Sequence, residues 1–239
     1  MHAIFKRDFV AYFTSAIGYI YIGAYIFVLN LVFYLNNALG STTSVSGIFS
    51  FMLMVMMFIT PILTMRVFSE EFKLKTDQLL LTTPVTTSSV VMGKFFSSFA
   101  VFGCLLGLTL LWPIVISIFG ENNLDEVVGN YIGILCIGAA YISIGIFVSA
   151  LTENQVVAAV GSLCIFIALY ILEIVAMMFY ASGALPVFVM RVFLFISIYG
   201  RYTEITQGLL SLDAIIFFLS VCAVFLFLTV RAIEKRRFG

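Results

Sequence analysis

Long apolar runs, separated by short polar segments, follow one another along almost the whole chain. Crossing the hydrocarbon core of a bilayer takes about 20 helical residues at 1.5 Å per residue, and six runs approach or exceed that length. The runs are continuously apolar rather than alternating, so they predict membrane-spanning helices and exclude a membrane β-barrel. The predicted spans are residues 17–34, 47–65, 95–119, 127–151, 156–180 and 214–230.

Two further segments are apolar but do not have the pattern of a span. In residues 1–16, Phe5, Phe9 and Phe13 recur on one helical face, which predicts an amphipathic helix in the membrane interface. Residues 187–199 are apolar but only 13 residues long. That length favours a re-entrant or interfacial segment over a span.

Composition agrees with this pattern, because 63% of the residues are hydrophobic and only 10% are charged. A soluble domain has roughly 45–50% apolar and about 25% charged residues. We therefore expect one membrane domain over residues 1–239. The formal net charge is zero, which gives no indication of a nucleic-acid partner. The four cysteines are far apart within apolar runs, which favours packing over a disulfide framework or a metal site.

The basic residues indicate the orientation, because short cytoplasmic loops are enriched in Lys and Arg. Six alternating spans place ten of the 12 basic residues on one side. This predicts that both termini and the loop at residues 66–94 lie in the cytoplasm. The ten are Lys6, Arg7, Arg66, Lys73, Lys75, Lys94, Arg231, Lys235, Arg236 and Arg237, with only Arg191 and Arg201 on the other side.

The loop at 66–94 is the longest charged interruption in the first two-thirds of the chain. Ser69 is a plausible N-cap, the carboxylates after it complement a helix dipole, and Glu71 and Lys75 have the spacing of an i, i+4 pair. Residues 82–84 (Thr-Thr-Pro) are expected to end this helix. Periodicity alone leaves open whether it docks a soluble partner or lies on the bilayer.

Catalytic chemistry has little support in the sequence. The only histidine is His2, so a Ser–His or Cys–His pair within the membrane is excluded. No aspartate lies near the centre of a span, and no G-x-x-x-x-G-K-[ST] phosphate loop is present. We expect no enzyme activity and no cofactor in this chain. Glu173 lies inside the fifth span, where a charge costs about 2.5–3.5 kcal/mol. It either faces a translocation path or a partner permease, or it reaches the outer interface.

Several short motifs resemble a known family. They are TMR at 64–66, SEE at 69–71, Thr76, LLLT at 79–82, Pro-Val at 84–85, Gly-Lys at 93–94 and SALTENQVVAAVGS at 149–162. Together with the order of the segments, they resemble the ABC-2-type transporter permeases, in particular the gliding-motility-associated and multi-copper-enzyme-maturation branch. The chain departs from the family pattern at Lys75, where the family often has Gly, and at Gln78, where it often has Glu.

The resemblance implies an all-α integral membrane protein with six transmembrane helices, an N-terminal interfacial helix (1–16), a cytoplasmic coupling helix (within 66–94) and an external re-entrant hairpin (181–212) before the sixth span. It implies a bacterial inner-membrane permease, driven by a separate ATPase subunit that holds ATP and Mg²⁺. A second copy or a homologous permease would complete the membrane part, and the family also allows a membrane-anchored extracytoplasmic subunit. The expected work is substrate export or mechanical work across the membrane.

The resemblance also assigns candidate site residues. The coupling helix and the turn at 152–155 would contact the ATPase, and Glu173 would lie on the translocation path or at the permease–permease contact. Solvated charges, burial of the apolar side chains in the chain's own spans, and helix capping by Glu153 remain open for the first group. That group is Glu70, Glu71, Phe72, Lys73, Thr76, Leu79, Leu80 and Glu153.

Two other functions fit a six-span chain. An ion channel or secondary transporter often carries several intramembrane charges or matching broken helices, whereas this chain has one central Glu and no clear inverted repeat. The chain could also anchor a larger assembly, such as a gliding or secretion machine. Association with an ATPase distinguishes the permease from these alternatives.

Overall fold

The computed structural model describes residues 1–35, 46–76, 86–119, 124–181, 200–202 and 212–238. These residues form helices and turns and no strand, and six stretches are long and apolar enough to cross a membrane. The predicted all-α membrane fold is therefore confirmed. The helices are α1 (His2–Thr14), α2 (Ala16–Phe33), α3 (Ser46–Thr64), α4 (Ser69–Lys73), α6 (Thr87–Thr109), α7 (Leu111–Phe119), α8 (Leu124–Leu151), α9 (Gln155–Ala181) and α12 (Leu212–Phe238).

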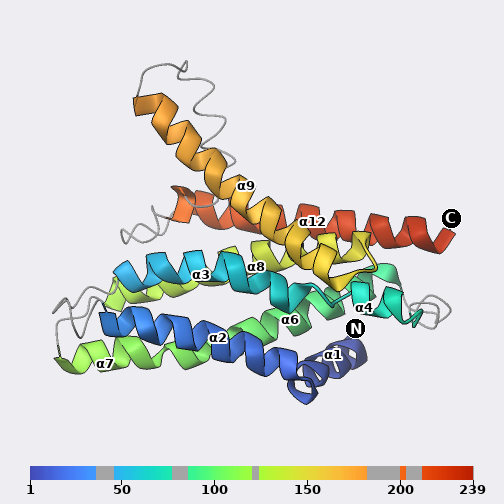
Figure 1. Cartoon of the computed structure of the whole chain (residues 1–239), viewed down its shortest axis with the longest axis horizontal. Helices are drawn as coiled ribbons and strands as arrows, with labels where there is room; N and C mark the ends of the chain where they lie inside the picture. Colours follow the sequence, from blue (N-terminus) through green and yellow to red (C-terminus); the bar gives the residue numbers. More distant parts are fainter. Residues whose placement is uncertain (36–45, 77–85, 120–123, 182–199, 203–211, 239) are drawn as a thin grey trace.

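Helix α8 is the centre of the bundle. It packs against α3, α6, α9 and, most extensively, α12. In its spanning part, 78% of the residues are buried within the chain. In α9 the share is only 22%, and this helix leans away from the bundle (Figure 1). The exposed faces of α2, α9 and α12 are rich in large apolar side chains, as expected for helices in contact with lipid.

The third predicted span is divided into α6 and α7, which corrects the expectation of one continuous helix over 95–119. Pro113 lies in the first turn of α7 and has no N–H to donate to the carbonyl of Thr109, four residues earlier. The helical bonding changes at Leu110, whose N–H bonds to Gly107, three residues earlier. The two helices still form one apolar stretch, Thr87–Ser117.

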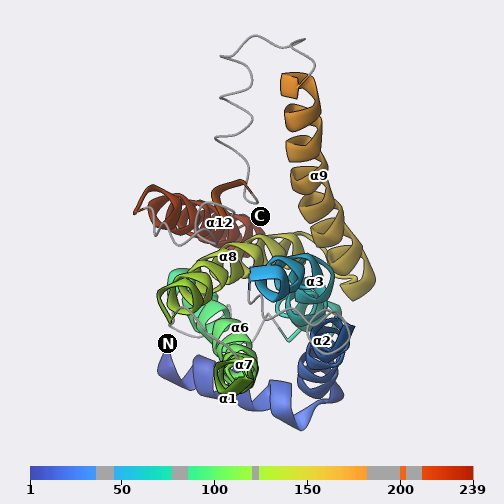
Figure 2. The same cartoon turned by 90° about the vertical axis from the view of Figure 1, so that its left-hand side faces the viewer.

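Helix α1 lies across the bundle beneath α6 and α2 (Figure 2), so a helix is confirmed in this segment, and its place in the membrane interface stays a prediction. Its buried anchor is Tyr12, whose hydroxyl donates to the carbonyl oxygen of Leu63 (3.1 Å) and lies 2.9 Å from Oγ of Ser98. Burial raises the pKa of Tyr12 far above its usual value, so this phenol stays neutral and keeps its hydrogen. The chain termini and α4 lie at the same end of the bundle (Figure 1).

One boundary of the predicted spans differs in the structure, and one predicted feature is not tested by it. Helix α12 continues to Phe238, eight residues beyond the predicted end at 230, so the basic tail extends the helix past the apolar segment. The predicted re-entrant hairpin at 181–212 lies almost wholly outside the described residues. Within it, Tyr202 is buried and its hydroxyl donates to the carbonyl oxygen of Phe49 at 3.3 Å.

Candidate functional site

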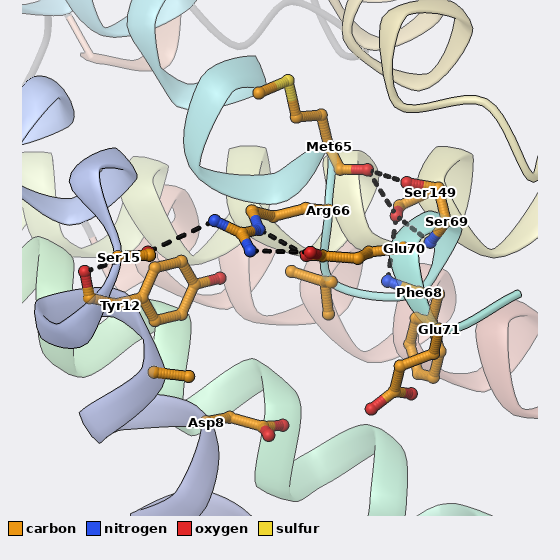
Figure 3. Close-up of polar contacts among 12 residues, drawn as sticks. Asp8, Tyr12, Ser15, Met65, Arg66, Phe68, Ser69, Glu70, Glu71 and Ser149 are labelled. Atoms are coloured by element: carbon orange, nitrogen blue, oxygen red, sulfur yellow. Dashed lines mark hydrogen bonds and ion pairs between the residues drawn. The ribbon is translucent and has the colours of Figure 1, made fainter. Parts of the chain in front are cut away.

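The turn between α3 and α4, residues 65–68, places α4 at the end of the bundle that carries both termini. Helix ends leave backbone groups without partners in the helix, and here one side chain from α8 binds three of them. Oγ of Ser149 accepts hydrogen bonds from the N–H groups of Phe68 (3.1 Å) and Ser69 (3.2 Å) and donates to the carbonyl oxygen of Met65 (3.1 Å) (Figure 3). Ser69 Oγ donates to that same carbonyl. The hydroxyl group of Ser149 therefore helps fix where α4 begins.

Lys94, on α6, supports α4 from the other side. Only 3% of this residue is exposed, and its Nζ donates to the carbonyl oxygen of Val67 at 2.7 Å. The same Nζ lies 2.9 Å from a carboxylate oxygen of Glu71 and 3.5 Å from one of Asp8. It also lies 5.0 Å from the ring centroid of Phe68. The ammonium group therefore donates to the Val67 carbonyl and forms ion pairs with Glu71 and, at longer range, with Asp8.

Two arginines complete the group of charges around α4. Arg66 forms a bidentate pair with Glu70 (2.5 and 2.8 Å) and donates to Oγ of Ser15 at 3.2 Å, as Figure 3 shows. Arg7 bridges Asp8 (2.7 Å) and Glu71 (2.8 Å). Three cations and three carboxylates are thus paired within the chain. We call Arg7, Asp8, Arg66, Glu70, Glu71 and Lys94 the α4 charge cluster.

Two of the predicted docking residues belong to this cluster and are paired within the chain. Glu70 and Glu71 have partners inside the chain, and Glu71 turns to Arg7 and Lys94 rather than to Lys75. The predicted i, i+4 pair of Glu71 and Lys75 is therefore wrong. Gly93 allows this arrangement, because a Cβ there would lie 3.1 Å from Ile4 on α1. A pocket of about 290 Å³ adjoins the cluster between α1, α4 and α6.

The end of α12 holds α4 from a third direction. The guanidinium group of Arg236 lies 4.0 Å from the ring centroid of Phe72, and its NH2 also donates to a carboxylate oxygen of Glu153 in the α8–α9 turn. Phe72 is 5% exposed and packs against Phe68. Of the two environments left open for Phe72, the structure therefore supports burial in its own chain. Glu153 binds a side chain and not a helix N–H.

The solvent-facing part of this region lies just beyond α4. Lys73 and Thr76 are exposed, and Leu74 is 63% exposed although it is apolar. Leu79 and Leu80, the remaining predicted docking residues, lie outside the described residues. Of the predicted set, Lys73 and Thr76 are thus available to a partner, whereas Glu70, Glu71, Phe72 and Glu153 are engaged within the chain. Leu74, which was not predicted, is available as well.

Helix α4 is shorter than predicted, since it ends at Lys73 and not near residues 82–84. Lys75 has a φ of 55°, and the N–H groups of Lys75 and Thr76 bond back to the carbonyls of Phe72 (3.1 Å) and Glu71 (3.0 Å). This is the Schellman arrangement that stops a helix, with a left-handed residue usually supplied by glycine. The sequence signal was missed because Lys occupies the glycine-type position.

We expect Lys75→Gly to stabilise the protein by about 1 kcal/mol, because glycine adopts a positive φ without the steric cost that lysine bears. The change is measured as a higher unfolding midpoint of the purified protein in detergent and slower amide exchange over residues 72–76. Lys73→Gly is the matched control, and inside the helix it should cost about 1 kcal/mol instead. Equal effects of the two substitutions would contradict this interpretation of the helix end.

Glu173 lies within the membrane part, far along α9 from this cluster. It is 3% exposed, so its side chain is buried within the chain. One helical turn before it, Tyr170 lines a groove of about 230 Å³ between α3, α8 and α9, together with Tyr141 and Phe51. Among the described residues, no group of His, Cys, Asp or Glu has the arrangement of a metal site.

Sequence reasoning missed the residues that hold α4 in place, although several lie in the motifs noted above. Lys94 is the lysine of Gly-Lys at 93–94, and Ser149 opens the SALTENQ segment. Neither residue type by itself indicates that it holds a helix in place, because Lys is commonly a solvated charge and Ser is common in small-residue helix contacts. Their partners are 23 to 86 positions away in the sequence, as in the bonds of Lys94 to Glu71 and to Asp8.

These features define a multi-pass α-helical membrane protein with a short helix held at the end of the bundle that carries both termini. Comparison with known families identifies it further: residues 9–238 match the ABC-2 family transporter protein family. The chain therefore belongs to the ABC-2 transporter family, as the motifs predicted. No curated protein matches the sequence.

Proposed function

We propose that this chain is the permease subunit of an ATP-binding cassette transporter and that a separate ATPase docks on α4. The observation that carries the proposal is the position of α4. It is a five-residue helix at the end of the bundle that carries both termini, and its last residue, Lys73, is exposed together with Leu74 and Thr76, which follow it. Charge pairs on its other side bind it to α1, to the α3–α4 turn and to α6.

A helix that receives force needs such support. A mobile α4 would absorb the displacement produced by the ATPase, whereas a helix with paired charges and buried aromatic rings moves with its neighbours. In this proposal, Lys73 and Thr76 contact the ATPase directly, and Glu70, Glu71 and Phe72 hold the helix in shape. Leu79, Leu80 and Glu153 remain proposed parts of the docking surface, with Glu153 already bound to Arg236.

The remaining parts of the machine follow from the same proposal. ATP and Mg²⁺ are bound by the ATPase subunit, and this chain does no chemistry of its own. A second copy or a homologous permease completes the path across a bacterial inner membrane, with both termini and α4 in the cytoplasm. Glu173 lies on that path or at the permease–permease contact, and the work done is export or mechanical work. Membership of the gliding-motility or multi-copper-enzyme-maturation branch, with its extracytoplasmic subunit, is part of the proposal.

The test is co-purification of the chain with an ATPase that carries a Walker A motif. We expect Lys73→Glu to weaken the complex at least tenfold, because reversing an exposed charge opposite a complementary partner turns attraction into repulsion. Lys6→Glu, which reverses an exposed charge on α1 outside the proposed surface, is the matched control. Affinity is measured by titrating the ATPase onto the permease in nanodiscs. A chain that binds no ATPase would instead favour a channel or secondary transporter.

A further inference from the structure

The hydroxyl group of Ser149 is fully used in bonds to the turn between α3 and α4. A serine hydroxyl offers one donor and two acceptor positions. All three bind backbone groups of residues 65–69, at distances of 3.1 to 3.2 Å, and Ser149 itself is fully buried. Removing the hydroxyl group would therefore remove all three bonds at a buried position. Without it, the N–H groups of Phe68 and Ser69 would have no partner that the structure shows.

Not every buried serine in the spans links two helices. Ser162 on α9 is also fully buried, but its hydroxyl donates only to the carbonyls of Ala158 (2.9 Å) and Ala159 (3.0 Å) in its own helix. Such back-bonding is common for serine in helices and links nothing else. Ser149, in contrast, joins α8 to the start of α4, bonding to residues that lie 80 and 81 positions earlier in the sequence.

Ser149 also lies where a displacement of α4 can enter the bundle. It lies two residues before the last residue of α8, the helix that packs most extensively against α12 and also contacts α3, α6 and α9. Lys94 binds the same turn through Val67 and belongs to α6. The turn therefore has side-chain bonds to two helices other than α3, which precedes it in the chain.

We propose that Ser149 is a positioning residue that ties α4 to α8, so that a displacement of α4 is passed to α8 and α12 instead of being absorbed at the α3–α4 turn. This inference rests on the proposed docking of an ATPase at α4. Ser149 touches neither the ATPase nor a substrate in this scheme. It acts only through the backbone that it binds.

The local part of the test is amide exchange of the purified chain in nanodiscs, followed by mass spectrometry. Ser149→Ala should speed exchange of the peptide covering residues 65–73 at least tenfold, because two buried amides lose their acceptor. Ser149→Thr keeps the hydroxyl group and should restore slow exchange. Ser162→Ala should leave that peptide unchanged. Unchanged exchange in Ser149→Ala would overturn the proposal without reference to any ATPase.

The second part measures transmission in the complex with the co-purified ATPase. Spin labels are placed at Leu31 on α2 and Val128 on α8, two exposed positions at the end of the bundle opposite α4, after the native cysteines are replaced by alanine. Trapping with ATP and vanadate should shift the distance between the labels in the parent chain. Ser149→Ala should lose at least half of that shift while the complex still hydrolyses ATP, and Ser149→Thr should recover it.

The outcomes separate this inference from the proposed function. An equal shift in Ser149→Ala and the parent, or no shift in the parent complex, overturns the role of Ser149. A parent chain that binds no ATPase defeats the proposed function, and the exchange experiment still decides whether Ser149 ties α4 to α8. If the alanine variant does not assemble, Ser149→Cys is compared by exchange, because a thiol is a weak hydrogen-bond partner. Slow exchange in that variant would also overturn the proposal.

Discussion

Lys94→Met should destabilise the protein by about 3–5 kcal/mol, the typical cost of removing one partner from a buried charge pair. Methionine fills a similar volume but carries no charge. Asp8 and Glu71, with side chains only 15% and 18% exposed, would then share the single cation Arg7. The carbonyl of Val67 would lose its 2.7 Å partner as well. The measurement is the free energy of unfolding in mixed detergent micelles.

Two variants show whether charge pairing causes that loss. Lys6→Met removes an exposed lysine from α1 and should change stability by less than about 0.5 kcal/mol, as surface substitutions usually do. Adding Glu71→Gln to Lys94→Met removes the carboxylate nearest to the missing ammonium group and should recover part of the stability. A double mutant whose loss equals the sum of the two single losses would show that Lys94 and Glu71 are not coupled.

The spans could be predicted because their signal is local. A continuous apolar run of sufficient length must be helical in a bilayer, since all backbone groups need partners within the segment. The fourth predicted span, 127–151, accordingly corresponds to α8, Leu124–Leu151. The division at Leu110 was missed although its cause, Pro113, was visible, because the apolar run continues through it. The length of an apolar run indicates that the segment crosses the bilayer, but it does not indicate where the hydrogen bonding within the helix changes.

The candidate site was only partly predictable, because its contacts join distant segments. The motifs contain Glu70, Glu71, Lys94 and Ser149, which the structure joins around α4, whereas the predicted contact of this region with an ATPase stays a prediction. Their partners Arg7, Lys94 and Arg236 come from α1, α6 and α12. A lysine that pairs inside the protein looks the same in sequence as one in solvent. Only the packing of α1 against α6 distinguishes Lys94 from Lys73.

The corner between α1 and α2 sets the position of α1, and through it the positions of Arg7 and Asp8 in the α4 charge cluster. Substitution of Gly18, which lies at this corner, should therefore affect the cluster. Helix α1 carries Arg7 and Asp8, so its angle to the bundle sets where their side chains meet α4. At the corner, a Cβ added to Gly18 would overlap the carbonyl oxygen of Tyr12 and lie 2.9 Å from its carbonyl carbon. These are backbone atoms, which cannot rotate away as a side chain can.

We therefore expect Gly18→Ala to cost about 3 kcal/mol, the upper end of the usual range for overpacking, because α1 must move to admit the methyl group. Gly23→Ala on the same helix is the matched control: its Cβ meets nothing within 4 Å, so it should be neutral or stabilise by up to about 1 kcal/mol. Unfolding in mixed micelles measures both. Because displacement of α1 pulls Arg7 and Asp8 from Glu71 and Lys94, Gly18→Ala should also speed amide exchange over 65–73. A destabilised variant with unchanged exchange there would mean that α1 does not support α4.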